Sequence, residues 1–113
     1  MICSAFDVVV VPFPFTDRRA SKRRPALAVS SQRFSSSSGH TLLAMITSAA
    51  NPAWPLDIVI DSATAGLRSP SKVRMKVFTL DNRLILRKTG SLRESDRRAV
   101  QRAIREVLAG GFD

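Results

Sequence analysis

Short apolar runs dominate the hydrophobic pattern of this chain. The runs at 6–11 and 26–29 are continuous rather than alternating, which is typical of short strands covered on both faces. A third strand is predicted at 41–48, with apolar side chains on both faces, and a fourth at 56–61. Residues 32–40 are rich in serine and lack apolar periodicity, so we expect a polar loop there.

The second half of the chain has a cleaner alternation. From 72 to 77 every second residue is apolar and the others are lysine or arginine, which predicts a half-buried strand with a basic outer row. The segment 67–93 carries eight basic residues against Asp81 alone, and a bound phosphate chain would relieve the repulsion along such a row. Residues 84–86 predict a further short strand, followed by a turn at Gly90.

The chain ends in a different period. Apolar residues recur at helical spacing from about Glu94 to Ala109, and two glycines follow, so we predict a C-terminal amphipathic helix. Ser91 with Glu94 fits a capping box, and Ser95 is an alternative start. A length of 113 residues suffices for one core, so we expect a single domain over residues 1–113.

The charge balance points to an anionic partner. The chain has 18 basic and 9 acidic residues, a net charge of +9, which favours nucleic acid or an acidic protein as partner. A membrane surface would attract the same charge, but no apolar run approaches the ~20 residues of a spanning helix, and a secretion signal is absent from the first residues. Cys3 is the single cysteine and has no internal disulfide partner. We therefore expect a cytoplasmic protein.

Positive charge is most concentrated between the first two runs. The loop 16–24 contains one acidic residue, Asp17, against five basic ones, Arg18, Arg19, Lys22, Arg23 and Arg24. Arg24 precedes Pro25, and the proline ring pushes the preceding residue into an extended conformation. A guanidinium held in this way suits a phosphate group through two parallel hydrogen bonds. Arg24 is therefore the first candidate site residue.

The stretches around this loop resemble the MazF/PemK family of toxin endoribonucleases. The likeness is carried by DVVVVPFPFTD at 7–17 and SKRRPALAVS at 21–30. It continues, in the family's order, through LLAMITS, LDIVID, GLRSPSKVRMKVFTLD and GSLRESDRRAVQRAIREVL. The resemblance covers nearly the whole chain. It implies a mainly β (α+β) fold, a small SH3-like antiparallel barrel with a C-terminal helix, assembled as a homodimer.

The same resemblance implies the site. In the family, an arginine matching Arg24 and a threonine matching Thr47 form the active site. By itself, Thr47 is simply a good strand former at a strand end, although its stiff side chain could direct the hydroxyl to a phosphate oxygen. The expected RNA-binding residues are the rest of the basic loop and several side chains downstream: Arg18, Arg19, Lys22, Arg23, Ser48, Trp54, Ser69, Ser71 and Lys72. Trp54 either caps the barrel or stacks on an unpaired base.

The expected chemistry needs no cofactor. Paired-cysteine, HExxH, GxGxxG and P-loop motifs are absent from the sequence, so we expect neither a metal ion nor a cofactor. RNA carries its own nucleophile, the 2′-hydroxyl beside the scissile phosphate, and the enzyme must orient it and stabilise the developing charge. Family precedent gives a 2′,3′-cyclic phosphate and a 5′-hydroxyl. We single out no residue as general base.

The predicted function follows from these points. We expect the toxin of a type II toxin-antitoxin system, a sequence-specific, metal-independent endoribonuclease that cleaves single-stranded mRNA and so inhibits translation and growth. Its other expected partner is a cognate antitoxin with an acidic segment that competes with RNA. Two alternatives remain open: a non-catalytic toxin resembling CcdB, and a basic RNA-binding barrel.

Overall fold

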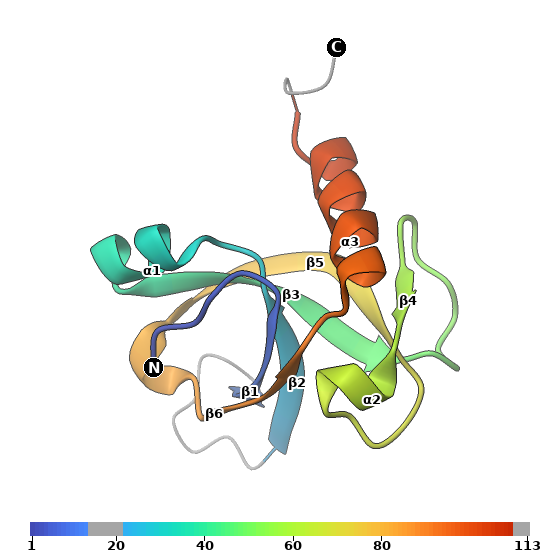
Figure 1. Ribbon diagram of the computed structural model, residues 1–113, viewed down its shortest axis with the longest axis horizontal. Coiled ribbons are helices and arrows are strands. Elements are labelled where there is room, and N and C mark those ends of the chain that lie inside the picture. The colour runs from blue at the N-terminus through green and yellow to red at the C-terminus, as the bar shows by residue number, and fades with distance from the viewer. Residues whose placement is uncertain (14–21, 110–113) are drawn as a thin grey trace.

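One curled sheet organises the protein. The structure, a computed structural model, describes residues 1–13 and 22–109. Six antiparallel strands follow the order β4-β5-β3-β2-β1-β6 (Figure 1). Their bounds are β1 Asp7–Phe13, β2 Lys22–Ala28, β3 His40–Ser48, β4 Ile58–Ile60, β5 Ser71–Asp81 and β6 Arg87–Ser91.

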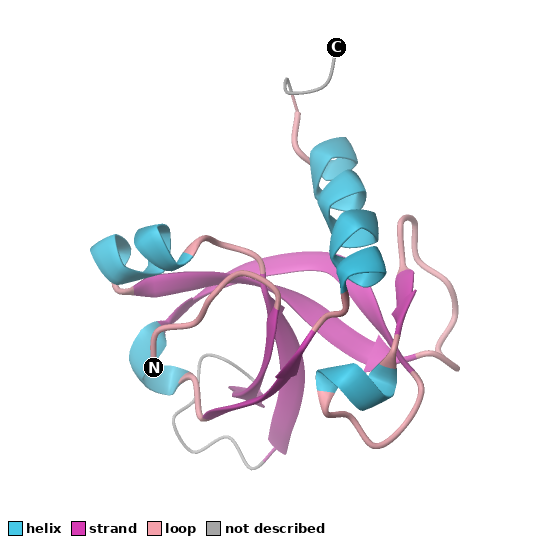
Figure 2. Ribbon diagram, in the orientation of Figure 1, coloured by secondary structure: helices cyan, strands magenta, loops and turns pink. Residues whose placement is uncertain are grey.

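Short helices surround the sheet within the described residues (Figure 2). They are α1 Gln32–Ser38, α2 Ser62–Ala65, the 3₁₀ turn η1 Asn82–Leu84, and α3 Glu94–Val107. In Figure 1, α1 lies at the left of the sheet and α2 at its right, and the second half of α3 projects beyond the sheet. The mainly β, half-barrel architecture with a C-terminal helix confirms the fold expected from the resemblance.

Two apolar clusters lie on opposite faces of the sheet. The cluster under α2 and α3 consists of Val8, Leu27, Ala44, Ile46, Ile60, Ala65, Val73, Leu92 and Val100. The cluster on the other face consists of Cys3, Val9, Val11, Ala26, Ala28, Leu43, Leu80 and Ile85. The central strands are thus buried on both faces, which explains why their apolar runs are continuous. Neither cluster extends to the ends of the sheet, so polar side chains can lie there.

Residues 32–40 were expected to be a loop, and this is wrong because most of them form α1. Ser31 caps the helix by accepting a hydrogen bond from the N–H three residues on, at 3.1 Å, and Gly39 ends it with φ +74°. Ser35 is buried and shares a hydrogen bond of 2.9 Å with Ser30. The serines act here as a cap and as buried polar contacts, so the helix has no apolar stripe to reveal it.

The segment after β5 also differs from expectation. Residues 84–86 are not a strand: η1 occupies Asn82–Leu84, and the Asp81 carboxylate caps it by accepting from the Arg83 N–H at 2.9 Å. Gly90, expected at a turn, lies inside β6. An aspartate side chain can hydrogen-bond to the nearby backbone and so favour a turn over a strand. The short apolar run at 84–86 gave no sign of this turn.

The C-terminal helix is confirmed at its start, while its end comes at Val107, two residues before the predicted one. Its N-cap, Arg93, makes no side-chain cap bond, so the capping box with Ser91 is not formed. The acidic residues of the first turn, Glu94 and Asp96, still favour this end through the helix dipole.

A bulge interrupts β5. Met45 pairs with Arg74, whereas Ala44 pairs with Val77, so two β5 residues have no partner on β3. Bulges bend a strand and strengthen its twist. Val77, predicted on the buried row, lies next to the bulge and is 42% exposed.

Candidate nucleic-acid interface

The start of β2 and the end of β3 meet at one end of the sheet. The two strands are antiparallel, with Ala26 opposite Met45. The pairing of β2 with β3 ends at Ala26 and Met45; the same register, extended by two residues, would bring Arg24 opposite Thr47. Opposite positions of neighbouring strands share a face, so the Arg24 and Thr47 side chains emerge on the same face of the sheet.

Arg24 is held in extended backbone, as the following proline predicts. It lies within β2, opposite Val11 of β1, and is exposed. Its guanidinium carbon lies 5.4 Å from the centroid of the Phe13 ring, a cation–π contact. The ring supports the guanidinium from one side and leaves its planar fork of donors for another ligand.

The Thr47 hydroxyl is oriented by a residue that sequence reasoning missed. Asn51 donates from Nδ2 to Thr47 Oγ1 at 2.5 Å. Asn51 is itself held by its backbone, because Lys72 Nζ donates to its carbonyl oxygen at 2.7 Å and its N–H bonds the Ser48 carbonyl at 3.1 Å. Since the Thr47 oxygen accepts from Asn51, the hydroxyl proton is available to another acceptor. In the sequence, an asparagine just past a strand indicates only a turn.

The outer row of β5 is not the free cationic row that alternation predicts. Lys72 is 5% exposed and forms an ion pair of 3.1 Å with Asp57, which also pairs with Arg74 at 3.1 Å. Burial raises the pKa of Asp57, but hydrogen bonds from Arg74, the Trp54 N–H and Lys72 outweigh it and lower that pKa to about 2. Lys76 lies over the Trp54 ring at 5.4 Å. Asp57 therefore relieves the repulsion that a phosphate chain was expected to relieve.

The other predicted RNA-binding serines lie near Thr47, because Ser48 pairs with Ser71 beside the pair of Thr47 with Lys72. The Ser48 hydroxyl accepts from the Ala50 N–H at 3.2 Å, and the buried Ser71 hydroxyl donates to the Ser69 carbonyl at 2.9 Å. Trp54 is 42% exposed. It lines a separate cavity of about 320 Å³ beside the end of α3, together with Pro55, Leu56, Met75 and Val107. Base stacking on Trp54 stays a prediction.

Four arginines line a pocket at the same end of the sheet as Arg24. Arg23 and Arg24 come from β2, Arg68 follows α2, and Arg87 begins β6; the pocket volume is about 230 Å³. The remaining lining residues are Val10, Pro25, Gly66, Leu67 and Thr89, and Thr47 is not among them. Lys22 begins β2 nearby and is exposed, whereas Arg18 and Arg19 lie outside the described residues. Arg68 and Arg87 were not among the predicted site residues.

Acidic side chains are engaged away from this pocket. Within residues 1–13 and 22–109, the ion pairs are Asp57 with Lys72 and Arg74, Asp81 with Arg83, Asp7 with Lys88, Asp96 with Arg93, and Glu94 with Arg98. None of these involves an arginine of the pocket. Its positive charge is therefore uncompensated by the described carboxylates and attracts anions.

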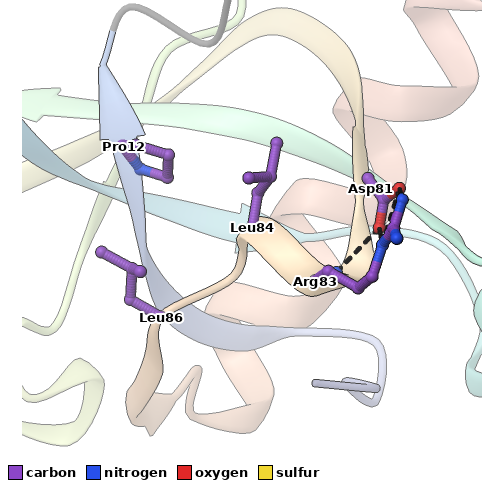
Figure 3. A pocket seen from close by; sticks show the side chains of 5 residues that line it. All are labelled: Pro12, Asp81, Arg83, Leu84 and Leu86. Carbon is purple, nitrogen blue, oxygen red and sulfur yellow. Dashed lines mark hydrogen bonds and ion pairs between the residues drawn. The ribbon is translucent and has the colours of Figure 1, made fainter. Parts of the chain in front are cut away.

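A larger cavity of about 420 Å³ is a weaker candidate. It is lined by Pro12, Leu84 and Leu86 together with Asp81 and Arg83 (Figure 3). The guanidinium of Arg83 donates to Asp81 at 2.8 Å, and this contact lowers the pKa of Asp81. Because its one cation is already paired, this cavity lacks the free donors that a phosphate needs.

Neither a metal centre nor a membrane span is found in the part of the chain that the structure describes. Over residues 1–13 and 22–109, no three His, Cys, Asp or Glu side chains gather closely enough to hold a metal ion. In the same ranges no helix combines the length and apolarity that crossing a membrane requires.

The curled antiparallel sheet and its C-terminal helix define a small half-barrel protein. At one end of the sheet lie an oriented hydroxyl and four arginines that form no ion pair with the described carboxylates. Residues 4–108 match the family described as PemK-like, MazF-like toxin of type II toxin-antitoxin system. The chain belongs to this family, whose members are known as endoribonucleases. No curated protein sequence matches it significantly.

Solved structures share this fold at low sequence identity. A MazE–MazF complex from Deinococcus radiodurans is 18% identical, with a TM-score of 0.76 over 96% of this chain and 97% of that one. An endoribonuclease in complex with its cognate antitoxin, from a mycobacterial species, is 12% identical, with a TM-score of 0.77 over 99% and 98%. A MazF toxin from Mycobacterium tuberculosis is 22% identical, with a TM-score of 0.70 over 88% and 93%.

Proposed function

We propose that this protein is the toxin of a type II toxin-antitoxin pair and cleaves single-stranded RNA in a sequence-specific way without a metal ion. The proposal is carried by the register of β2 and β3, which, extended two residues past Ala26 and Met45, would set Arg24 and Thr47 opposite each other on one face of the sheet. At this end the four described arginines that line a pocket form no ion pair with a described carboxylate. Membership in a family of endoribonucleases supports the reaction class. Single-stranded RNA is the substrate because its bases can be splayed and read, unlike those of an A-form duplex.

In the proposed reaction the RNA supplies the nucleophile. The 2′-oxygen gives its proton to water and attacks the adjacent phosphorus. The bond from phosphorus to the 5′-oxygen breaks, and that oxygen takes a proton from water. The products are a 2′,3′-cyclic phosphate and a 5′-hydroxyl. Arg24 stabilises the negative charge that builds on the phosphorane-like transition state, and Thr47 donates its hydroxyl proton to a non-bridging oxygen. A guanidinium, with a pKa above ~12, is a poor acid, so charge stabilisation is the main role of Arg24.

Two further residues, Asn51 and Lys72, hold the Thr47 hydroxyl in position. Asn51 occupies the oxygen of the Thr47 hydroxyl and so directs its proton outward. Lys72 holds the Asn51 carbonyl and is neutralised by Asp57. We therefore assign Lys72 to positioning the loop, in place of the RNA contact predicted from the sequence.

We further propose a homodimer and an acidic antitoxin as partners, in the cytoplasm where mRNA is found. Two of the similar structures are complexes with an antitoxin, and unpaired arginines attract carboxylates as well as phosphates. The sheet leaves β4 and β6 as edges, and Val59 of β4 is 66% exposed; small open sheets commonly cover such edges by pairing. A monomer mass in sedimentation equilibrium at micromolar concentration would count against the dimer.

The test is cleavage of single-stranded RNA in excess EDTA. The wild-type protein should cut, and Arg24→Ala should lower kcat by about 10²–10³-fold, the usual effect of removing a transition-state donor. Thr47→Ser keeps the hydroxyl and should retain more activity than Thr47→Ala. If wild type leaves RNAs of varied sequence intact, the enzyme proposal fails. If Arg24→Ala cuts as fast as wild type, the assignment of Arg24 fails.

A further inference from the structure

We propose that the pocket lined by Arg23, Arg68 and Arg87, which Arg24 also lines and which is here called the arginine pocket, binds a phosphate of the RNA strand other than the one that is cleaved. The proposal rests on the proposed function for the identity of the strand. It gives Arg68 and Arg87 a role in holding the substrate, separate from the chemistry at Arg24 and Thr47.

The strand register separates the two sites. Arg23 and Arg24 are neighbours on β2, so their side chains leave on opposite faces. Val10 pairs with both Pro25 and Arg87, and these positions share the Arg23 face. Thr47 does not line the arginine pocket, whereas Arg24 does, so the two sites adjoin at Arg24. A strand that passes over the end of β2 would therefore meet Arg24 and Thr47 on one face and the arginine pocket on the other.

The walls of the arginine pocket are fixed by close packing between α2 and β6. Gly66 has φ +73°, and a Cβ there would overlap the Thr89 carbonyl oxygen. Thr89 Oγ1 in turn donates to the Ala65 carbonyl at 2.9 Å. Arg68 follows Gly66 by two residues, so this contact brings its backbone next to β6, where Arg87 begins. Fixed walls reduce the ordering cost of binding.

The chemistry of the arginine pocket favours a phosphate. Its volume of about 230 Å³ is below the ~300 Å³ of sites for drug-sized ligands and suits one phosphate with part of its sugar. Guanidinium groups bind phosphate with paired hydrogen bonds. No carboxylate lines the pocket among the described residues, so no internal anion competes. Because an RNA strand carries a phosphate at every nucleotide, a strand bound at Arg24 would bring a further phosphate to the adjoining arginine pocket, which is why we favour the nucleic acid.

The test separates binding from cleavage. A random-sequence single-stranded DNA 20-mer keeps the phosphates and lacks the 2′-hydroxyl, so it binds without being cut. Its affinity for wild type, Arg68→Ala, Arg68→Gln and Arg87→Ala would be measured by fluorescence anisotropy at several salt concentrations. Arg102→Ala is the matched control, because Arg102 is exposed on α3 and away from the pocket. RNA cleavage by the same proteins gives KM and kcat.

Each pocket variant should bind about five- to tenfold more weakly at low salt, and the slope of log K against log salt should fall by ~0.7 per lost phosphate contact. KM should rise by a similar factor, with kcat within about twofold, and Arg102→Ala should match wild type. Polyglutamate serves as an acidic-peptide probe of the same variants. Unchanged DNA binding, a kcat loss without a KM change, or weaker binding of polyglutamate with DNA binding unchanged would each overturn the proposal. If wild type cuts no RNA but the binding pattern holds, the cleavage reaction fails and the phosphate site stands.

Discussion

The orientation of a single hydroxyl proton distinguishes the proposed role of Thr47 from that of an ordinary strand residue. Asn51 donates to Thr47 Oγ1. Changing Asn51 to aspartate replaces this donor with a group that only accepts, so the Thr47 proton would turn toward the carboxylate and away from the substrate. We expect Asn51→Asp to lower the single-turnover cleavage rate by about 10²-fold, and Asn51→Ala to lower it less.

The control for added charge is Ala53→Asp. Ala53 is exposed in the same loop, so this variant brings a similar negative charge without the hydrogen bond to Thr47. It should weaken RNA binding and leave the single-turnover rate at saturation within about threefold of wild type, since exposed charges act mainly on association. Equal rates for the two aspartate variants would mean that charge, and not hydroxyl orientation, explains the loss.

Asp57 holds two cations and should carry a pH-dependent part of the stability. Its pKa in the folded protein is about 2, below the ordinary value of 3.8. A lowered pKa contributes stability above the unfolded-state pKa, and this contribution is lost as pH falls from about 4 to about 2. Asp57→Asn leaves Lys72 buried without its anion, which should cost on the order of 3 kcal/mol at pH 7.

Urea unfolding at pH 7, 4 and 2.5 measures this effect. The wild type should lose stability over that range, and Asp57→Asn should lose less of it because the titrating group is gone. Glu106→Gln is the matched control, since Glu106 is exposed on α3 and forms no ion pair within the described residues. Its stability should stay within about 0.5 kcal/mol of wild type. An Asp57→Asn protein as stable as wild type at pH 7 would contradict the role given to this carboxylate.

At the scale of elements, two glycines with the same backbone have different surroundings. Gly39 and Gly66 end helices with φ +74° and +73°, but a Cβ meets nothing within 4 Å at Gly39 and overlaps the Thr89 carbonyl at Gly66. Gly39→Ala should cost about 1 kcal/mol, the left-handed penalty alone. Gly66→Ala should cost at least twice that, because α2 must move away from β6. Thermal unfolding compares the two, and equal losses would mean that the α2–β6 contact is easily displaced.

The elements also show how far the sequence predicts the fold. Apolar runs located the central strands, and helical periodicity located α3, because in these segments burial alone sets the residue pattern. The helix α1 and the turn η1 escaped prediction, because their stability comes from Ser31, Gly39 and Asp81 as caps, with no apolar stripe. The bulge of β5 follows from its pairing with β3, which no local pattern records.

The site was predictable in part. The extended backbone of Arg24 follows from Pro25, and family resemblance brought in Thr47; the role of both in catalysis stays a prediction. The sequence did not predict three site residues, because tertiary contacts bring them to the site. Asn51 reaches Thr47 from the following loop, and the packing of α2 on β6 brings Arg68 close to Arg87. Lys72 was predicted as an RNA contact from its place in a basic row, but in the fold it is buried against Asp57. A single sequence has no signal for such pairing.

At the scale of the whole molecule, the uneven distribution of charge governs association. The net charge is +9, and the pocket arginines are unpaired among the described residues, so an acidic antitoxin segment and RNA should compete for this end. The affinity of a synthetic acidic peptide should fall about tenfold or more between 50 and 300 mM salt, because exposed charges are screened beyond ~10 Å at 0.1 M salt. A flat salt response, or simultaneous binding of peptide and single-stranded DNA, would contradict this shared surface.

The most direct measurement of the central claim uses one atom of the substrate. Once a cut site is mapped on an RNA, an oligonucleotide is made with a single 2′-deoxynucleotide on the 5′ side of that bond and tested in EDTA beside the all-ribose version. The account predicts that wild type cuts the ribose strand to a 2′,3′-cyclic phosphate and leaves the deoxy strand intact, while Arg24→Ala cuts neither at a comparable rate. Cleavage of the deoxy-substituted bond at the normal rate would show that the 2′-hydroxyl is not the nucleophile.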